Sequence, residues 1–367
     1  MPESLPIPSF EVEGFRAIRS LKVADLKRVN LFVGENNAGK TSLLEALQLY
    51  LHRNSRTLSA VLLDTVRGHS DFSAPVYGST LREDDALELQ FAIDAVEGLF
   101  YGSFHELPLH PIRLSPAGDD ATSLTIRLPW SPDGPIGDGA SSERPAVVDP
   151  ASAVLDVRSE ARGFEIPLNW FARRVVLRSA ELHLAVVIPS NGLSSFDTRT
   201  MWDNIAVSGR EALVEDALRV IVPQLDRIIL IGESRLRSVV CKLKGVARPI
   251  PLKAMGDAAT RVFGMAVAVA HAQGGAVLID EVENGLHYSI QSQVWNAIFS
   301  MASTLDVQVF ATTHSWDTVV AFQDAANRSP EEGILYRLDR EDDGWIHPVR
   351  YTEEEVAIAA DQQIEVR

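Results

Sequence analysis

The chain has 367 residues, of which 46% are hydrophobic and 23% are charged, a balance typical of a soluble globular protein with a large core. Its formal net charge of −16 argues against a protein that coats DNA with its whole surface, but leaves room for a local basic strip. The apolar runs are too short for a membrane span, the N-terminus lacks the pattern of an export signal, and the only cysteine, Cys241, excludes an internal disulfide. We therefore expect a cytoplasmic protein of one or two domains that makes no contact with a membrane.

The first elements are predicted to be strands, a glycine loop and a helix. Phe10–Ile18 alternates and predicts a strand that bends at Gly14, residues 21–23 predict a second strand, and Val29–Val33 predicts a buried one. Residues 34–41 then match the pattern G-x-x-x-x-G-K-[ST] at every fixed position. A helix with apolar residues at helical spacing follows over residues 41–51.

This order of elements predicts a nucleotide site. A helix N-terminus directs free amides at a phosphate, and glycines let the backbone curl closely around it. Lys40 can reach the β- and γ-phosphates of ATP, and the Thr41 hydroxyl can hold Mg²⁺. A chance glycine turn is the alternative, which the strand and the helix on either side disfavour. The residues predicted to bind ATP here are Gly34, Asn36, Asn37, Ala38, Gly39, Lys40, Thr41 and Ser42.

The middle of the chain carries weaker signals. Residues 86–93 alternate like an antiparallel strand with one solvated face, and residues 97–165 predict an inserted loop or small subdomain. Arg173, Arg174 and Arg178 form a basic cluster near a short strand at 175–177, which an edge strand with solvated charges explains most simply.

Further along, residues 203–222 have helical periodicity, and residues 228–231, 238–243 and 246–250 predict an antiparallel meander. Gly256 and Asp257 stand where the N-cap of the apolar helix 262–272 belongs. We expect three regions: an N-terminal lobe (1–96), an inserted region (97–250) and a C-terminal lobe (251–367).

Two acids end a second buried strand. Ala276–Ile279 is apolar throughout, as the centre of a parallel sheet requires, and Asp280 and Glu281 follow at the end where such sheets bind ligands. Asp280 can hold Mg²⁺ opposite Thr41, and Glu281 can orient and deprotonate the attacking water. A charged turn after a core strand would be the better interpretation if the glycine loop were absent.

A third buried strand over residues 307–315 ends in polar residues and places His314 at the rim of the sheet. A lone histidine at a strand end is usually structural. Because it lies one predicted helix beyond the two acids, we expect it to contact the γ-phosphate or the attacking water.

Together these elements resemble the ABC-type ATPases of the RecF/SMC/OLD group, in particular stand-alone bacterial OLD-like ATPases. The resemblance covers both ends of the chain and is carried by residues 15–18, 34–41, 188–190, 255–257, 279–287 and 311–315, most specifically by the run DEVENGLHYS at 280–289. It implies an α/β fold of the P-loop NTPase class: an ABC-type ATPase head with a mixed β-sheet and an inserted subdomain.

The resemblance also implies roles. Lys40 and Thr41 match the Walker A ligands, Asp280 and Glu281 match the Walker B acid and catalytic base, and His314 matches the switch histidine. Residues 284–287 occupy the D-loop position. Gly256 and Asp257 occupy the signature position, where a helix N-terminus caps the γ-phosphate bound by a partner. Such ATPases form head-to-tail dimers around two ATP molecules, so a second copy of the chain is implied.

This sequence departs from the family pattern in places. Residues 253–255 are Lys-Ala-Met without the usual serine, and Ala258 stands where many relatives keep glycine, so the contact in trans can fall to backbone amides and Lys253. No Q-loop glutamine can be assigned, and Gln90 is better explained as structural.

Residues 334–338 and 345–349 predict a hairpin, whose acidic turn at 339–344 is better explained as a solvated turn than as a metal site. After His314 we expect no room for the TOPRIM nuclease domain of full OLD proteins. The resemblance therefore implies a separate effector, as in two-gene anti-phage defence systems.

Our first functional hypothesis is an ATP-hydrolysing sensor or scaffold that controls such an effector in anti-phage defence or DNA maintenance. The alternative is a RecF-like repair ATPase that clamps duplex DNA directly, and salt-sensitive, ATP-dependent DNA binding would distinguish it. A transporter subunit, a non-hydrolysing nucleotide-binding module and a structural protein rank below these two.

Overall fold

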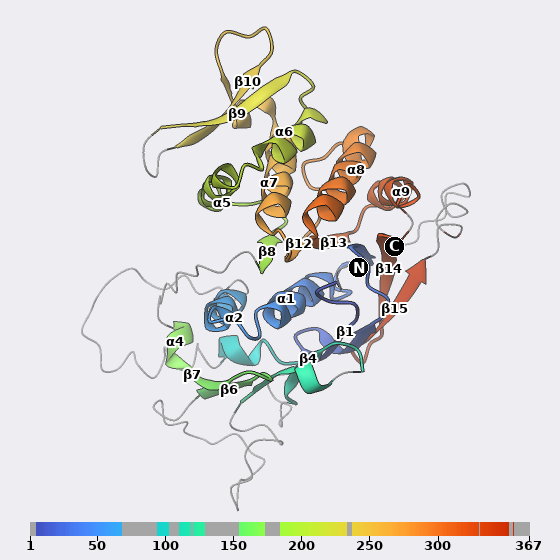
Figure 1. Cartoon of the computed structure of the whole chain (residues 1–367). Helices are drawn as coiled ribbons and strands as arrows, with labels where there is room; N and C mark the ends of the chain where they lie inside the picture. The colour runs from blue at the N-terminus through green and yellow to red at the C-terminus, as the bar shows by residue number, and fades with distance from the viewer. Residues whose placement is uncertain are drawn as a thin grey trace, which may run out of the picture.

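The computed structural model describes residues 5–67, 94–102, 110–118, 120–128, 154–172, 184–232, 237–329, 331–351 and 355. Over these residues the chain is an α/β protein with a twelve-stranded mixed sheet and a separate three-stranded sheet. In Figure 1 a layer of helices lies above the large sheet, and the small sheet stands at the top. The predicted fold class, an ABC-type ATPase head with a mixed sheet, is confirmed by this architecture.

Five parallel strands form the centre of the large sheet. In spatial order they are β14 (Gly333–Arg340), β3 (Val29–Val33), β13 (Gln308–Thr313), β12 (Ala276–Ile279) and β8 (Ala185–Ile188). Alternate residues enter different cores: Leu31 packs into the cluster that includes the upper helices, and Phe32 into the cluster on the other face. Both faces of these strands are therefore covered, which explains why their sequences are apolar throughout.

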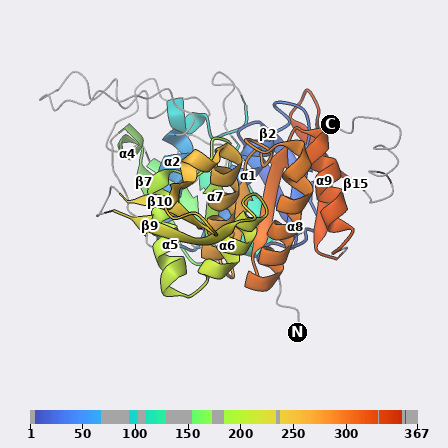
Figure 2. The same cartoon turned by 90° about the horizontal axis from the view of Figure 1, so that it is seen from above.

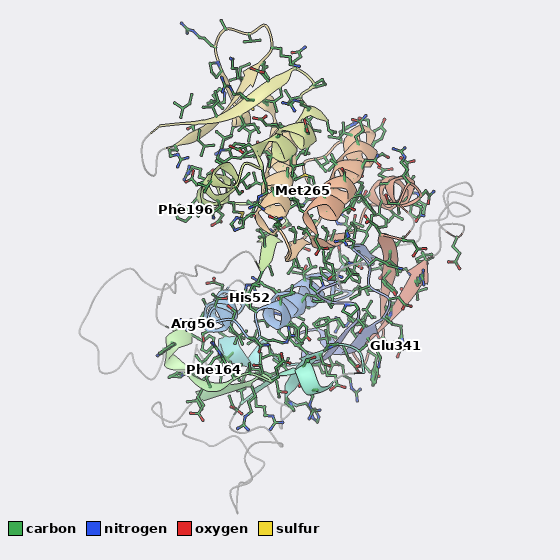
Figure 3. The ribbon with its side chains drawn as sticks, in the orientation of Figure 1. His52, Arg56, Phe164, Phe196, Met265 and Glu341 are labelled. Carbon is green, nitrogen blue, oxygen red and sulfur yellow. The ribbon has the colours of Figure 1, made fainter. Side chains whose placement is uncertain are left out.

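One face of the centre is covered by helices. They are α5 (Ser195–Val207), α6 (Glu211–Arg219), α7 (Asp257–His271), α8 (Tyr288–Leu305) and α9 (Trp316–Ala326). The last three lie side by side (Figure 2). Met265 of α7 is buried in this layer, whereas Phe196 of α5 lies on its outside (Figure 3). The small sheet consists of β9 (Leu225–Ile231), β10 (Ser238–Leu243) and β11 (Ile250–Pro251). After β11 a 3-10 turn, η3 (Leu252–Met255), leads into α7.

The other face carries α1 (Lys40–Leu51) and α2 (Leu58–Arg67). Beyond it the sheet continues as an antiparallel wing of β2 (Ile18–Val23), β1 (Phe10–Phe15), β4 (Ile112–Ser115), β5 (Leu124–Arg127), β6 (Val154–Arg158) and β7 (Gly163–Pro167). Two short elements accompany the wing, η1 (Asp120–Thr122) and α4 (Asn169–Ala172). Strand β15 (Trp345–Tyr351) pairs with β14 in an antiparallel hairpin and with β2 in parallel, so it joins the wing to the centre.

Three expectations need correction. Residues 10–18 are not one bent strand, because the chain turns at Arg16, whose φ is +51°, and pairs with itself as β1 and β2. Residues 203–222 are two helices, because the chain breaks at Gly209, where φ is +71°. The described parts of 97–165, expected to form an inserted loop or a small subdomain, instead add β4–β7 to the main sheet, where Leu114 and Ile126 are completely buried.

The predicted meander and the hairpin are confirmed. The predicted strand at 86–93, Gln90 and the cluster of Arg173, Arg174 and Arg178 lie outside the described residues. The division into three regions stays a prediction. Cys241 is buried, and burial raises the pKa of its thiol to about 11. Within the described part of the chain, no helix combines the length and hydropathy needed to cross a membrane.

Candidate functional site

Strand register brings three segments of the predicted site to one edge of the sheet. Strand β13 lies between β3 and β12, with Thr313 opposite Val33 and Ala311 opposite Ile279. The residues that follow these strands are the glycine loop after β3, Asp280 after β12 and His314 after β13. Because the three strands are parallel, all three segments leave the sheet at the same edge, as predicted.

The glycine loop depends on residues without a Cβ at two positions. A Cβ on Gly34 would stand 2.8 Å from the carbonyl oxygen of Leu338, and a Cβ on Gly39 would stand 2.7 Å from Cδ1 of Ile346. Gly39 also has φ +86° at the N-cap of α1, a conformation that glycine adopts at little cost. The loop therefore fits tightly against the β14–β15 hairpin, and Arg340 of the hairpin donates a hydrogen bond to the Asn37 carbonyl (3.1 Å).

Lys40 lies inside the loop that precedes it. Its Nζ donates to the carbonyl oxygens of Gly34 (2.7 Å) and Glu35 (2.8 Å). Burial lowers the pKa of Lys40, while the nearby carboxylates of Asp280, Glu281 and Glu283 act in the opposite direction. A cation held at the mouth of a loop that begins a helix is the arrangement that binds nucleotide phosphates. A groove of about 530 Å³, lined by residues 35–38 and 338–342, gives room beside the loop for more than a phosphate.

The two predicted magnesium ligands meet across the site. The Thr41 hydroxyl is 3.3 Å from both carboxylate oxygens of Asp280. Thr312, from β13, donates a hydrogen bond of 2.7 Å to Oδ1 of Asp280 and accepts one of 3.0 Å from the Glu281 amide. A hydroxyl and a carboxylate facing each other at this separation are hard oxygen donors of the type Mg²⁺ prefers, so these residues fit the ion. Thr312, which the sequence reasoning did not single out, fixes the direction of the acidic turn.

Both the backbone and the carboxylate of Glu281 are constrained. Its backbone has φ +46°, which is uncommon for a residue with a side chain. Its carboxylate accepts a 2.7 Å hydrogen bond from Asn284, whose amide also donates to the carbonyl of Ser190 (3.2 Å). We expected residue 284 to belong to a loop across a dimer interface, but its side chain bonds within its own chain. Such support keeps a carboxylate in one orientation, as a general base requires.

His314 lies against a second glutamate. Its Nδ1 is 3.2 Å from Oε1 of Glu283 and 3.7 Å from Oε1 of Glu281, and its backbone amide donates to the same Glu283 oxygen (3.0 Å). Glu283 is mostly buried, and its Oε2 makes no hydrogen bond. The structure thus places His314 beside the acids as predicted, and it adds Glu283 as the group that holds the imidazole.

Arg261 of α7 was missed by sequence reasoning. It is 7% exposed and donates hydrogen bonds of 2.9 Å to the carbonyls of Pro189, Asp280 and Glu281. Burial lowers its pKa, and the carboxylates of Glu283, Asp280 and Glu281 oppose that shift. The only signal in the sequence was a single arginine directly before the apolar run at 262–270. It ties the strand ends of β8 and β12 to α7.

The predicted signature residues do not join this cluster. Gly256 caps α7 with φ +98°, and Asp257 begins the helix and is exposed. Their neighbour is Gly285, where an added Cβ would stand 3.7 Å from the Cβ of Asp257. Among the described residues no hydrogen bond or ion pair links Gly256 or Asp257 to residues 34–42. The predicted Walker A and Walker B residues and His314 therefore come together in one chain, whereas Gly256 and Asp257 lie beside Gly285 and are not bonded to the glycine loop.

The acidic turn at 339–343 forms ion pairs, not a metal cluster. Glu341 lies 3.0 Å from Nε2 of His347, and Asp343 lies 3.6 Å from Arg19. Over the described ranges, no group of three or more histidine, cysteine or acidic side chains is arranged to hold a metal ion. The interpretation of this turn as solvated stays a prediction.

Comparisons with known proteins agree with this geometry. A family model described as "AAA domain, putative AbiEii toxin, Type IV TA system" matches residues 179–321, and one described as "AAA ATPase domain" matches residues 6–90. The chain is 24% identical over 371 residues to a protein of Helicobacter pylori named "ATP/GTP phosphatase", which spans 94% of this chain and 95% of that protein. A stretch of 45 residues is 47% identical to an uncharacterized protein of Methanocaldococcus jannaschii, covering 12% of this chain and 20% of that protein.

Solved structures with a similar fold are head domains of SMC proteins. One, bound to the C-winged helix domain of ScpA, has a TM-score of 0.52 at 14% identity and covers 96% of this chain and 99% of its own. Another, bound to the C-terminal domain of ScpA derived from Pyrococcus furiosus, has a TM-score of 0.50 at 12% identity and covers 98% and 99%. At these identities the likeness concerns the fold alone.

The chain is an ATPase, and its fold is similar to that of SMC head domains. An ATPase of this kind hydrolyses ATP, and in this chain the phosphate-binding loop, the paired acids and the histidine form one site.

Proposed function

We propose that two copies of this ATPase enclose two ATP molecules and that hydrolysis in the dimer controls a separate effector protein, such as a nuclease or a toxin, in anti-phage defence or DNA maintenance. The observation that carries the proposal is that, among the described residues, no hydrogen bond or ion pair joins the predicted signature residues to the phosphate-binding loop. Gly256 and Asp257 are exposed beside Gly285, so a second copy must bring its loop to them before ATP is enclosed on both sides.

Within one chain the proposed roles follow from the contacts. Lys40 exchanges its two carbonyl partners for phosphate oxygens. Thr41 and Asp280 would hold Mg²⁺, which neutralises charge on the phosphates during transfer. Glu281 orients the attacking water and takes its proton, while Asn284 holds the other carboxylate oxygen. His314, held by Glu283, donates to the developing charge on the γ-phosphate.

Two comparisons support a partner of a different sequence. The SMC heads in the solved structures are each bound to a piece of a separate protein, ScpA. For this chain a comparable partner is our proposal. ATP binding would close the dimer and hold the partner, and hydrolysis would release it.

The first test compares the wild type with Glu281→Gln. ATP turnover and mass by light scattering are measured side by side, with Lys40→Ala as the control that does not bind ATP. Loss of the base should stop hydrolysis but retain ATP, so the variant should accumulate a dimer that forms only with ATP. Undiminished turnover in Glu281→Gln would refute its role as the base.

A mixing experiment tests whether the site is shared between copies. Lys40→Ala disables the phosphate-binding loop, and Gly256→Asp places a carboxylate where the partner's γ-phosphate is proposed to lie. Each variant alone should lack turnover. In a mixed dimer one of the two sites joins an intact loop to an intact signature, so the mixture should regain activity. If the mixture stays inactive while both variants fold and Gly256→Asp still binds ATP, the site is not composite.

The Glu281→Gln dimer then serves as bait for the effector in the native host. One partner recovered with ATP and lost with Lys40→Ala would support the proposal, whereas an ATPase that remains alone would contradict the role of a control subunit. ATP-dependent binding of duplex DNA by the pure protein, weakening steeply with salt, would instead favour the DNA-clamping alternative.

A further inference from the structure

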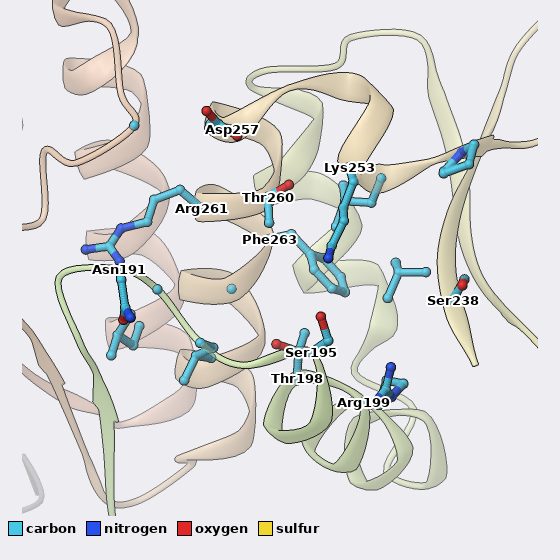
Figure 4. A pocket seen from close by; sticks show the side chains of 18 of the residues that line it. Asn191, Ser195, Thr198, Arg199, Ser238, Lys253, Asp257, Thr260, Arg261 and Phe263 are labelled. Carbon is cyan, nitrogen blue, oxygen red and sulfur yellow. The ribbon is translucent and has the colours of Figure 1, made fainter. Parts of the chain in front are cut away.

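A second cavity lies apart from the phosphate-binding loop. It has a volume of about 460 Å³ and opens between the start of α5, the small sheet, η3 and the first turns of α7 (Figure 4). None of residues 34–42 lines it. Its size is within the range of small-molecule sites in proteins. Asp280, Glu281 and His314 do not line it either.

The cavity combines apolar walls with positive charge. Leu193, Val239 and Phe263 supply apolar surface. Among the described residues of the lining, the cations are Arg199, Arg237, Arg261 and Lys253, and the one carboxylate is Asp257. Four cations to one acid is the reverse of the whole chain, which carries a net charge of −16. Carboxylates outside the lining pair with Arg237 (Asp203) and lie close to Arg261 (Glu283, Asp280 and Glu281). The positive charge left to attract an anionic ligand is therefore that of Lys253 and Arg199.

Most of these cations already have partners, but Lys253 does not. Arg237 pairs with both carboxylate oxygens of Asp203 (2.6 and 2.9 Å), and Arg199 donates to the Arg237 carbonyl (3.0 Å). The side-chain ammonium of Lys253 makes no hydrogen bond or ion pair with any described residue. In Figure 4 its ammonium points into the cavity beside Phe263, with Ser195 and Thr198 on the opposite wall. A lysine ammonium between an aromatic ring and hydroxyl groups can bind a phosphate, carboxylate or sulfonate.

We propose that this cavity binds a small ligand in which an anionic group is joined to an apolar ring or chain, and that the bound ligand changes the rate of ATP hydrolysis. The anion pairs with Lys253, and the apolar part lies on Leu193, Val239 and Phe263. The second half of the proposal rests on the proposed function, whereas the binding itself does not.

Two residues connect the cavity to the proposed catalytic base, Glu281. Arg261 and Asn284 both line the cavity. Arg261 bonds the carbonyls of Asp280 and Glu281, and Asn284 holds the Glu281 carboxylate. A ligand that competes for the Asn284 amide or displaces Arg261 alters the orientation of the proposed base. It changes kcat for ATP and leaves the affinity of the phosphate-binding loop unchanged.

The test uses 8-anilinonaphthalene-1-sulfonate, an aromatic sulfonate that fluoresces in apolar sites, with saturating Mg-ADP occupying the phosphate-binding loop. Lys253→Met removes the ammonium and keeps the apolar stem. Gly264→Leu fills the cavity from α7, because an added Cβ there has no neighbour closer than Leu193 Cδ1 at 4.0 Å, and leucine favours a helix. Lys244→Met, at an exposed lysine of the same lobe outside the cavity, is the matched control.

The wild type should bind the probe saturably. Lys253→Met should weaken binding roughly tenfold or more, as loss of a charge-assisted contact does, Gly264→Leu should abolish it, and Lys244→Met should leave it unchanged. No saturable binding by the wild type, or equal binding by all four proteins, overturns the site. If the probe binds as expected but wild-type turnover does not respond, the link to hydrolysis is wrong while the site stands.

Discussion

Arg261→Met is the substitution that tests whether α7 positions the catalytic turn. The arginine makes three hydrogen bonds of 2.9 Å to backbone carbonyls at the ends of β8 and β12. Methionine fills much of the same volume but donates nothing. The change therefore removes the tie between α7 and the turn that carries Asp280 and Glu281, and leaves their side chains in place.

The expected loss of stability depends on which of the three carbonyls still has a hydrogen-bond donor in the variant. In the variant the Pro189 carbonyl still accepts a hydrogen bond from the Gly192 backbone amide (2.8 Å), and the Glu281 carbonyl still accepts one from the Asn284 backbone amide (3.1 Å). Among the described residues, only the Asp280 carbonyl is left without a donor. Hydrogen bonds from a charged group contribute about 1.5–3 kcal/mol each. Relief of the buried charge offsets part of the loss, which leaves about 3 kcal/mol. With an unfolding entropy of about 2.1 cal/mol/K per residue, this lowers Tm by roughly 4 °C.

The loss of activity should be larger than the loss of stability suggests. A displacement of about 1 Å in a catalytic group can lower a rate by about 100-fold, so kcat should fall by that order with the KM for ATP little changed. Turnover is measured well below Tm, and melting is followed by circular dichroism.

Arg210→Met is the matched control. Arg210 also bonds a carbonyl of α7, that of Ala270 (2.6 Å), together with Gln273 (2.9 Å), but at the far end of the helix. It should lower Tm and leave kcat within about twofold of the wild type. If Arg261→Met melts as expected yet turns over ATP normally, Arg261 does not position Glu281. If both variants lose activity equally, general loosening of α7 explains the result.

Three further predictions concern other parts of the molecule. Glu283→Gln should lower kcat by roughly 10- to 100-fold with unchanged ATP affinity, because the glutamine amide keeps an acceptor for the His314 backbone but loses the charge beside the imidazole. Steady-state kinetics that match the wild type would exclude a role of Glu283 in holding His314. Gly34→Ala should weaken ATP binding in calorimetry by at least roughly tenfold, because its Cβ would stand 2.8 Å from the Leu338 carbonyl, and normal affinity would show that the loop adapts. The Cys241 thiol has a pKa of about 11 in the folded protein against an ordinary value of 9.0, so the unfolded thiol releases its proton first as pH rises. The free energy of unfolding should therefore fall from about pH 9 towards pH 11. Urea denaturation of Cys241→Ala should lack that part of the fall, and a pH profile identical to that of the wild type would contradict the prediction.

Local sequence determined the elements that bind phosphate. The strand at 29–33, the loop and the helix from residue 40 are encoded within 23 consecutive residues, since glycine spacing and apolar runs act over short distances. The same holds for Ala276–Ile279 with its two acids and for the β14–β15 hairpin. These elements needed no distant residue to be recognised, and each was predicted in place.

Tertiary structure decided which residues hold those groups. The bonds of Arg261 to Pro189, of Asn284 to Ser190 and of Thr312 to Asp280 join positions 72, 94 and 32 residues apart, and no local periodicity reports such a pairing. The wing of β4–β7 was likewise missed because antiparallel partners across long connections are chosen by the buried face of the whole sheet. The sequence by itself therefore determined the chemistry of the loop and the acids. Only the packed sheet and α7 decided how Glu281 is oriented and that the signature stands apart from the loop, because orientation depends on contacts between strands that are distant in the chain.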